Sequence, residues 1–236
     1  MKTDRLVEKI RDNMARIRER MDNAAQRAGR PPESVRLICV SKRFPVDVAR
    51  AAVEAGARDL GENYVQEARG KIAAMPDAPV RWHLIGHLQR NKARYVPGLF
   101  ELVHTVDSYK LARELDKQAA RAGVVQDVLL QVNVGGETQK AGIEPDRVAE
   151  LAGDVSGLPG LSLKGLMCMP PFFDQPERVS PFFARLRECA EDVRRQGIAG
   201  ISMDELSMGM SGDFEVAIAE GATLVRVGTS IFGERP

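Results

Sequence analysis

The chain has 236 residues, of which 44% are hydrophobic and 28% are charged, and its formal net charge is +1. These values are typical of an ordinary globular protein, and the near-neutral charge gives no support for nucleic acid as a partner. The charged N-terminus lacks the apolar core of a signal peptide and no apolar run approaches the roughly 18 residues of a membrane span, so we expect a cytoplasmic protein without membrane contact.

The first predicted element is a long amphipathic helix over residues 3–28. Leu6, Ile10, Met14 and Ile17 recur at helical spacing with charged residues between them, which is the pattern of a helix with one buried face. Gly29 and two prolines then end it. This helix would either cover the rest of the fold or pair with another chain.

Strands and helices alternate along the remaining sequence. Apolar, β-branched runs predict eight strands, at residues 35–41, 59–63, 81–86, 102–106, 128–134, 163–169, 204–208 and 223–228. Helical patterns separate most of them, at residues 46–55, 64–74, 109–122, 145–155, 181–196 and 213–220, and the polar residues 87–92 could open another helix. We therefore predict an α/β fold, a single (β/α)8 TIM barrel over residues 1–236 with an extra N-terminal helix. An open doubly wound sheet is the alternative, because periodicity does not show closure.

Polar or glycine-rich residues follow several of the predicted strands. In a barrel they converge on one rim, where active-site groups are placed. Gly209, Gly212 and Gly228 would let backbone N–H groups approach an anion, and Thr229 would open a short helix after the last strand. We therefore predict a phosphate site on the last two loops. The alternative for residues 207–211 is a small-residue turn that only lets the next helix begin.

Arg226 is a charged residue between Val225 and Val227 in an otherwise apolar strand. Burying a guanidinium without a partner is costly. The arginine should therefore either contact a ligand at the rim or form an internal structural ion pair.

Lys42 stands at the end of the first predicted strand, and Pro45 disfavours helical geometry at Phe44. A lysine on this strand that faces a phosphate site on the last two loops could hold an aldehyde-bearing phosphate ester as a Schiff base, with pyridoxal 5′-phosphate as the leading candidate. Imine formation needs an unprotonated amine, and partial burial beside Arg226 would favour that form. A Schiff-base aldolase for a sugar phosphate would use the same lysine without the cofactor.

The sequence gives little support for a metal site or a disulfide bond. The three cysteines are far apart and lack a CxxC pair, so we expect no disulfide, and we expect Cys39 and Cys168 to be buried. His83 and His87 lie at a strand end and not on a helix, and no third ligand is evident, so no zinc site is predicted. No nucleophile elbow supports a Ser-His-Asp triad.

Five motifs run from the first predicted strand to the last. They are Val-Ser-Lys at 40–42, Gly-Glu-Asn-Tyr-Val-Gln-Glu at 61–67, Trp-His-Leu-Ile-Gly-His-Leu-Gln at 82–89, Leu-Ser-Met-Gly-Met-Ser at 206–211 and Val-Arg-Val-Gly-Thr at 225–229. Together they resemble the YggS/PROSC family of pyridoxal phosphate homeostasis proteins. The resemblance implies a barrel similar to the N-terminal domain of alanine racemase, with pyridoxal phosphate held covalently on Lys42.

The resemblance also implies which other residues bind the cofactor. These are Asn63, Ser207, Ser211, Arg226, Gly228 and Thr229. Arg226 would face the pyridine nitrogen, and Gly228, Thr229 and Ser207 would hold the phosphate. Arg90 stands where the family commonly has serine, so no contact is carried over to that position.

The roles that the resemblance implies for these residues limit the chemistry that the bound cofactor could support. A guanidinium beside the pyridine nitrogen disfavours protonation of that nitrogen and weakens the ring as an electron sink. A racemase also needs a second acid/base group, which in alanine racemase comes from a separate domain of a partner chain, and this sequence ends soon after the last predicted strand. We therefore expect a monomeric protein of intracellular vitamin B6 homeostasis, with no catalytic residue established. It would buffer pyridoxal phosphate or deliver it to apoenzymes, and a pyridoxal phosphate-dependent amino-acid racemase is the alternative.

Overall fold

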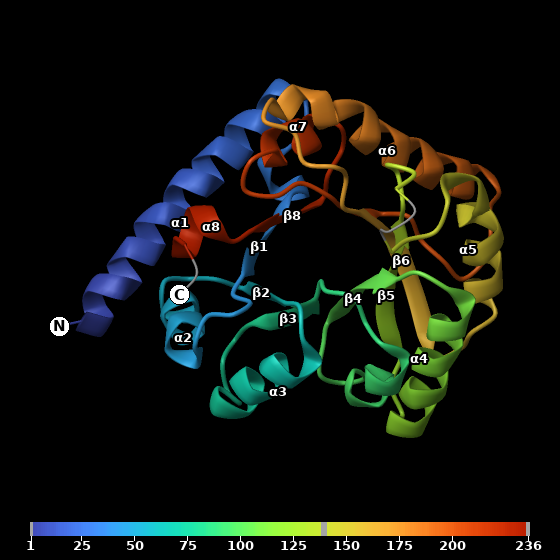
Figure 1. The fold of residues 1–236 in the computed structure, drawn as a ribbon, viewed down its shortest axis with the longest axis horizontal. Coiled ribbons are helices and arrows are strands. Elements are labelled where there is room, and N and C mark those ends of the chain that lie inside the picture. The colour runs from blue at the N-terminus through green and yellow to red at the C-terminus, as the bar shows by residue number, and fades with distance from the viewer. Residues whose placement is uncertain (1, 138–140, 235–236) are drawn as a thin grey trace.

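The computed structural model describes residues 2–137 and 141–234, in which eight parallel strands form a closed barrel in sequence order (Figure 1). The strands are β1 (Arg36–Val40), β2 (Asp59–Glu62), β3 (Arg81–Leu84), β4 (Leu102–Val106), β5 (Gln126–Val132), β6 (Leu161–Cys168), β7 (Glu205–Ser207) and β8 (Leu224–Val227). The barrel closes where β8 pairs with β1, with Arg226 opposite Ile38. The predicted (β/α)8 barrel is confirmed, and the open doubly wound sheet is wrong.

Helices lie outside the strands (Figure 1). The α-helices are α1 (Lys2–Arg27), α2 (Val46–Glu54), α3 (Val65–Ala74), α4 (Tyr109–Ala122), α5 (Val148–Ser156), α6 (Ser180–Arg195), α7 (Phe214–Ala219) and α8 (Thr229–Phe232). Short 3-10 helices are η1 (Pro32–Ser34), η2 (Arg90–Tyr95), η3 (Pro145–Arg147) and η4 (Pro176–Val179). The polar residues 87–92 therefore lead into a 3-10 helix and not into an α-helix.

Helix α1 lies outside the repeating pattern and packs against α2, α7 and α8 (Figure 1). Its apolar stripe is buried at Val7, Ile10, Met14, Ile17 and Met21. Fully burying each of the larger side chains contributes about 1.5–3 kcal/mol. The Asn13 amide also donates to the Ile231 carbonyl in α8, at 2.7 Å. Of the two roles expected for this helix, covering the barrel is confirmed.

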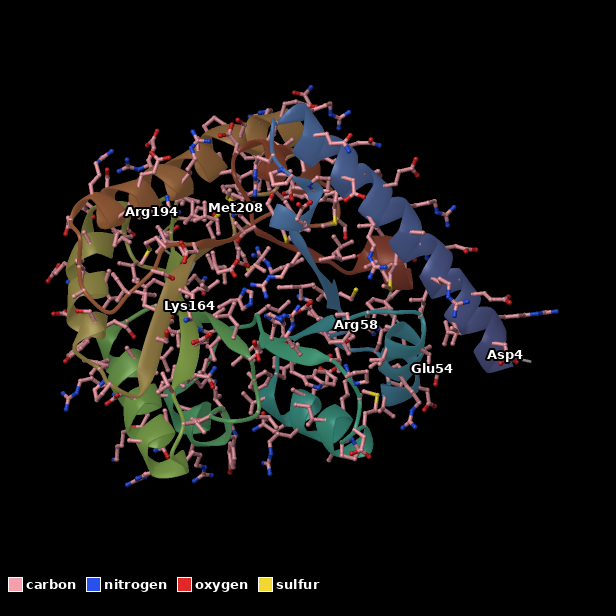
Figure 2. The ribbon with its side chains drawn as sticks, turned by 180° about the vertical axis from the view of Figure 1, so that it is seen from behind. Asp4, Glu54, Arg58, Lys164, Arg194 and Met208 are labelled. Carbon is pink, nitrogen blue, oxygen red and sulfur yellow. The ribbon has the colours of Figure 1, made fainter. Side chains whose placement is uncertain are left out.

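The interior of the barrel is filled by side chains. Five strands contribute one residue each to an apolar cluster, which consists of Ile38, Leu102, Leu129, Met167 and Leu224. A larger core lies between the strands and the helices. Met208, labelled in Figure 2, is fully buried at the end of β7, whereas Glu54 and Arg194 are exposed on the outer helices. A ligand can therefore approach at an end of the barrel and not through it.

All predicted strand boundaries agree with the structure within two residues. The clearest differences are at β5, predicted at 128–134 and found at Gln126–Val132, and at β6, which begins two residues early. Asn133 leaves β5 because its backbone N–H donates to the carbonyl of Ile143 and not to β6. All three cysteines are free and buried, which confirms the burial predicted for Cys39 and Cys168. Of the helices in the described ranges, none is long and apolar enough to cross a membrane.

Candidate functional site

A cavity of about 520 Å³ opens at the carboxyl end of the barrel. Each of the eight strands, or the segment directly after it, contributes to its lining. Residues far apart in sequence therefore meet here, including Lys42 after β1, Thr105 on β4 and Thr229 after β8. This is the rim on which (β/α)8 barrels carry their functional groups.

Lys42 lies half-buried in the turn after β1, and the main chain on both sides of it is hydrogen-bonded to other elements. The Ser41 carbonyl accepts from Lys71 Nζ at 2.7 Å, and the Arg43 backbone N–H donates to Glu67 Oε1 at 2.6 Å. Arg43 has φ +65°, a left-handed conformation that residues other than glycine rarely adopt. These contacts hold the turn in a conformation that the backbone alone would disfavour.

The network behind this turn is centred on Lys71, whose side chain is 4% exposed. Besides the Ser41 carbonyl, Lys71 Nζ contacts Glu62 Oε1 at 2.7 Å and Glu67 Oε1 at 2.8 Å, so all three ammonium protons have acceptors. The Ser41 hydroxyl donates to Glu62 Oε1 at 2.6 Å. Burial raises the pKa of Glu62 to about 7, although the hydrogen bonds from Lys71 and Ser41 act in the opposite direction. Glu62 Oε2 has no hydrogen-bond partner in the described part of the chain.

The loops after β7 and β8 meet at the cavity. The Gly228 N–H donates to Ser211 Oγ at 3.3 Å, and Thr229 begins α8 beside them. Gly209 has φ +89°, and a Cβ there would lie 2.6 Å from Ala217 Cβ in α7. Glycine therefore lets this loop lie directly against α7. The two loops bring two hydroxyl groups and glycine-rich backbone to one wall of the cavity.

Arg226 also lines the cavity, although only 4% of its surface is exposed. One guanidinium nitrogen donates to Ser207 Oγ at 2.5 Å and another to the Cys168 carbonyl at 2.9 Å. Burial lowers its pKa from the ordinary value. Among the residues that the structure describes, no carboxylate forms an ion pair with it. The sequence left two explanations for a charged residue at position 226, a ligand contact and an internal ion pair. The position of Arg226 in the cavity lining favours the ligand contact.

The ends of β2 and β3 approach each other closely at Asn63. A Cβ on Gly86 would lie 2.4 Å from the Asn63 carbonyl oxygen, so only glycine allows this contact. The Thr105 hydroxyl donates to the Gly86 carbonyl at 2.8 Å and fixes the same segment. Asn63 is thereby placed on the cavity wall.

Six of the seven predicted cofactor-binding residues line the cavity, namely Lys42, Asn63, Ser211, Arg226, Gly228 and Thr229. The seventh, Ser207, is fully buried and is not part of the lining. Its hydroxyl contacts Arg226 and His104, and its expected role at a phosphate stays a prediction. Arg90 is exposed and also lies outside the lining.

The apolar residues after β6 were missed by the sequence reasoning. Met169, Phe172 and Phe173 line the cavity, and Phe172 is 85% exposed. Two prolines directly before two phenylalanines at the end of a strand were the available signal, because such a segment cannot continue the strand. The contact between His83 and His104, at 3.0 Å inside the barrel, was missed as well.

Comparison with known proteins gives matches over nearly the whole chain. The family model described as "Alanine racemase, N-terminal domain" matches residues 10–236. The pyridoxal phosphate homeostasis protein of Aquifex aeolicus is 44% identical over 224 residues, which cover 95% of this chain and 97% of that protein. The protein of the same name from Pseudomonas aeruginosa is 46% identical and covers 96% of both chains.

A solved structure extends the comparison to three dimensions. PipY of Synechococcus elongatus, in its structure with PLP bound, is 39% identical to this chain. The two superpose with a TM-score of 0.83, over 95% of this chain and 100% of PipY. The barrel described above is thus also that of a relative whose structure has PLP bound.

Proposed function

This chain belongs to the pyridoxal phosphate homeostasis proteins of the alanine racemase N-terminal domain family, and on that premise we propose that it holds pyridoxal 5′-phosphate on Lys42. It would buffer the free cofactor or deliver it to apoenzymes, as one domain over residues 1–236, a monomer in the cytoplasm. The observation that carries the proposal is that Lys42 shares one cavity with Arg226 and with the loops after β7 and β8.

The residues present fit this cofactor. A cavity of about 520 Å³ is in the range of small-molecule sites. It combines an amine, a buried guanidinium and hydroxyl groups, the set that an aldehyde with a phosphate group requires. When bound, pyridoxal phosphate supplies an aldehyde whose carbon joins the lysine nitrogen as an imine, with loss of one water.

Each wall of the cavity has its own part in the proposal. Lys42 provides the covalent attachment from the β1 side. Ser211, Thr229 and the backbone at Gly228 bind the phosphate on the adjoining side, at the loops after β7 and β8, and Asn63 orients the ring. No described residue is assigned as an acid or base that moves a proton on a substrate.

Arg226 favours storage of the cofactor over its use in catalysis. The guanidinium is held by Ser207 and the Cys168 carbonyl, so it is a fixed cation at the cavity. A cation beside the pyridine nitrogen opposes protonation of that nitrogen, whereas a carboxylate would promote it. The ring is then a poor acceptor of electrons, which suits a carrier.

Uptake of the cofactor tests the proposed function directly. We expect purified protein, titrated with pyridoxal phosphate and then dialysed, to retain about one equivalent with the absorbance of a lysine imine. Size-exclusion chromatography of the loaded protein would show a monomer. Protein that retains no pyridoxal phosphate after dialysis would disprove the function.

The racemase alternative uses the same cavity and is motivated by the alanine racemase N-terminal domain match. Incubation of the loaded protein with L-alanine or other L-amino acids, followed by chiral chromatography, separates the two functions. We expect no rapid formation of the D-enantiomer. Rapid turnover would instead make the chain an enzyme.

A further inference from the structure

Five buried polar side chains are joined through the inside of the barrel. We call them the buried polar chain: Asp59, His83, His104, Ser207 and Arg226. His83 Nε2 lies 2.8 Å from Asp59 Oδ1, and His83 Nδ1 lies 3.0 Å from His104 Nε2. His104 Nδ1 lies 2.8 Å from Ser207 Oγ, which Arg226 contacts at 2.5 Å. Since β5 and β6 separate His104 on β4 from Ser207 on β7, this contact crosses the barrel interior.

The hydrogen-bond directions are assigned from the two ends of the chain. A guanidinium only donates, so Ser207 Oγ accepts from Arg226, and since His104 Nδ1 is its only other contact among the described residues, we assign the hydroxyl proton to that nitrogen. The His104 proton is then on Nε2 and is donated to His83 Nδ1. The His83 proton is likewise on Nε2 and is donated to the carboxylate of Asp59, which only accepts. Both histidines are therefore neutral Nε2–H tautomers, and every member of the buried polar chain is satisfied.

The pKa of His104 agrees with a neutral imidazole at that position. Burial lowers it well below its ordinary value, with His83, Arg226 and Arg36 acting in the same direction. Asp59 also accepts from Arg81 at 2.8 Å. Although burial acts in the opposite direction, the hydrogen bonds from His83 and Arg81 keep the pKa of Asp59 below its ordinary value. A carboxylate at one end thus faces a guanidinium at the other, across two neutral imidazoles.

Given pyridoxal phosphate as the ligand of the cavity, we propose that the buried polar chain positions the Arg226 guanidinium for the cofactor. Its other four members are positioning residues, because they do not line the cavity. In the described residues no ion pair holds Arg226, so its orientation depends on Ser207 and on the Cys168 carbonyl. Ser207 in turn is oriented by His104, and the two histidines by Asp59.

The protonation pattern can be tested without any cofactor. Nitrogen NMR of the histidine-labelled protein at neutral pH distinguishes the two tautomers of each imidazole. The sequence holds three histidines, and the exposed His87 supplies the signal of a solvated ring. We expect His83 and His104 to be Nε2–H tautomers. A proton on Nδ1 of either ring would overturn the assigned direction and the proposal with it.

The effect on the ligand is tested by Ser207→Ala, which removes the link next to Arg226. We expect the dissociation constant for pyridoxal phosphate to rise about tenfold, corresponding to ~1.4 kcal/mol. The absorbance maximum of the bound cofactor should shift, because the cation beside the ring is no longer fixed. The adduct on Lys42 should still form, since the lysine is untouched.

Gln126→Met is the matched control for loss of a buried polar side chain. Gln126 is 2% exposed, donates to the Phe100 carbonyl at 3.0 Å and lies outside both the cavity and the buried polar chain. This variant should lose stability but keep the wild-type affinity and spectrum. A Ser207→Ala protein with wild-type affinity and absorbance would overturn the proposal, and so would equal shifts in both variants. A wild-type protein that takes up no cofactor would disprove the proposed function, and the NMR result would then stand by itself.

Discussion

Replacing Lys42 by alanine is expected to remove the imine absorbance and to raise the dissociation constant for pyridoxal phosphate by at least about a hundredfold. The variant keeps the donors of the loops after β7 and β8, at Ser211 and Thr229, so weak, non-covalent binding should remain. The covalent attachment is lost because no amine is left after β1 at this place. Titration followed by absorbance and by equilibrium dialysis measures both changes.

Two further variants separate the effect of the covalent attachment of the cofactor from the effect of the lysine charge. Lys42→Arg keeps a cation at the cavity wall but does not form the imine, so it should lose the absorbance and recover part of the affinity. Lys110→Ala, on the exposed start of α4, should behave as the wild type. Borohydride reduction and peptide mapping of the wild-type protein would locate the adduct. An adduct mapped to another lysine would contradict the assignment of Lys42.

Replacing Lys71 by methionine is expected to destabilise the fold by about 3 kcal/mol at neutral pH. Methionine fills a similar volume but leaves Glu62 buried without its cation, and it also removes a donor to the Ser41 carbonyl. Denaturant unfolding of the two proteins measures the difference in the free energy of unfolding. Lys110→Met is the control for an exposed lysine and should change stability by less than about 0.5 kcal/mol.

The pH dependence of the stability lost in Lys71→Met follows from the pKa of Glu62. Its pKa in the folded protein, about 7, lies above its ordinary value of 4.5, so the folded state binds the extra proton. The contribution of Glu62 to stability is therefore fully present below the ordinary pKa and decreases as the pH rises through the folded value. Without Lys71 the carboxylate is harder still to ionise, and the loss should be larger at about pH 8 than at about pH 5.

A second substitution tests whether the buried Glu62 carboxylate causes the loss of stability in Lys71→Met. In the Lys71→Met background, Glu62→Gln should restore part of the lost stability at about pH 8, because the amide carries no charge to bury. If the double variant is as unstable as the sum of the single variants, Glu62 is not the source of the destabilisation.

The sequence predicted the barrel and most of the cavity because both depend on local patterns. Alternating strands and helices indicate the fold, and residues directly after strands, such as Lys42 and Thr229, reach the same rim in any such barrel. Ser207 is the exception among the predicted binding residues. It still belongs to β7, whereas Ser211 lies beyond the strand, and only the structure shows that Ser207 is buried against Arg226 while Ser211 lines the cavity.

Contacts between separate elements could not be predicted in this way. Lys71 has the sequence context of an exposed helical lysine, and its burial depends on where Glu62 on β2 lies relative to α3. His83 and His104 are on neighbouring strands, but their contact depends on the register, which pairs His83 with Leu102. Hydrophobic periodicity encodes neither the strand register nor which residue of a helix lies opposite which residue of a strand.

The turn that holds Lys42 has a thermodynamic consequence for binding. Ordering the backbone of one residue costs about 1–2 kcal/mol in conformational entropy. Because the contacts of Ser41 and Arg43 already order this turn in the folded protein, that cost belongs to the free energy of folding and not to that of cofactor binding. Binding a cofactor then restricts little more than the side-chain torsions of the lysine. Release of the cofactor leaves the main chain as it was, so the emptied protein is preorganised for the next molecule.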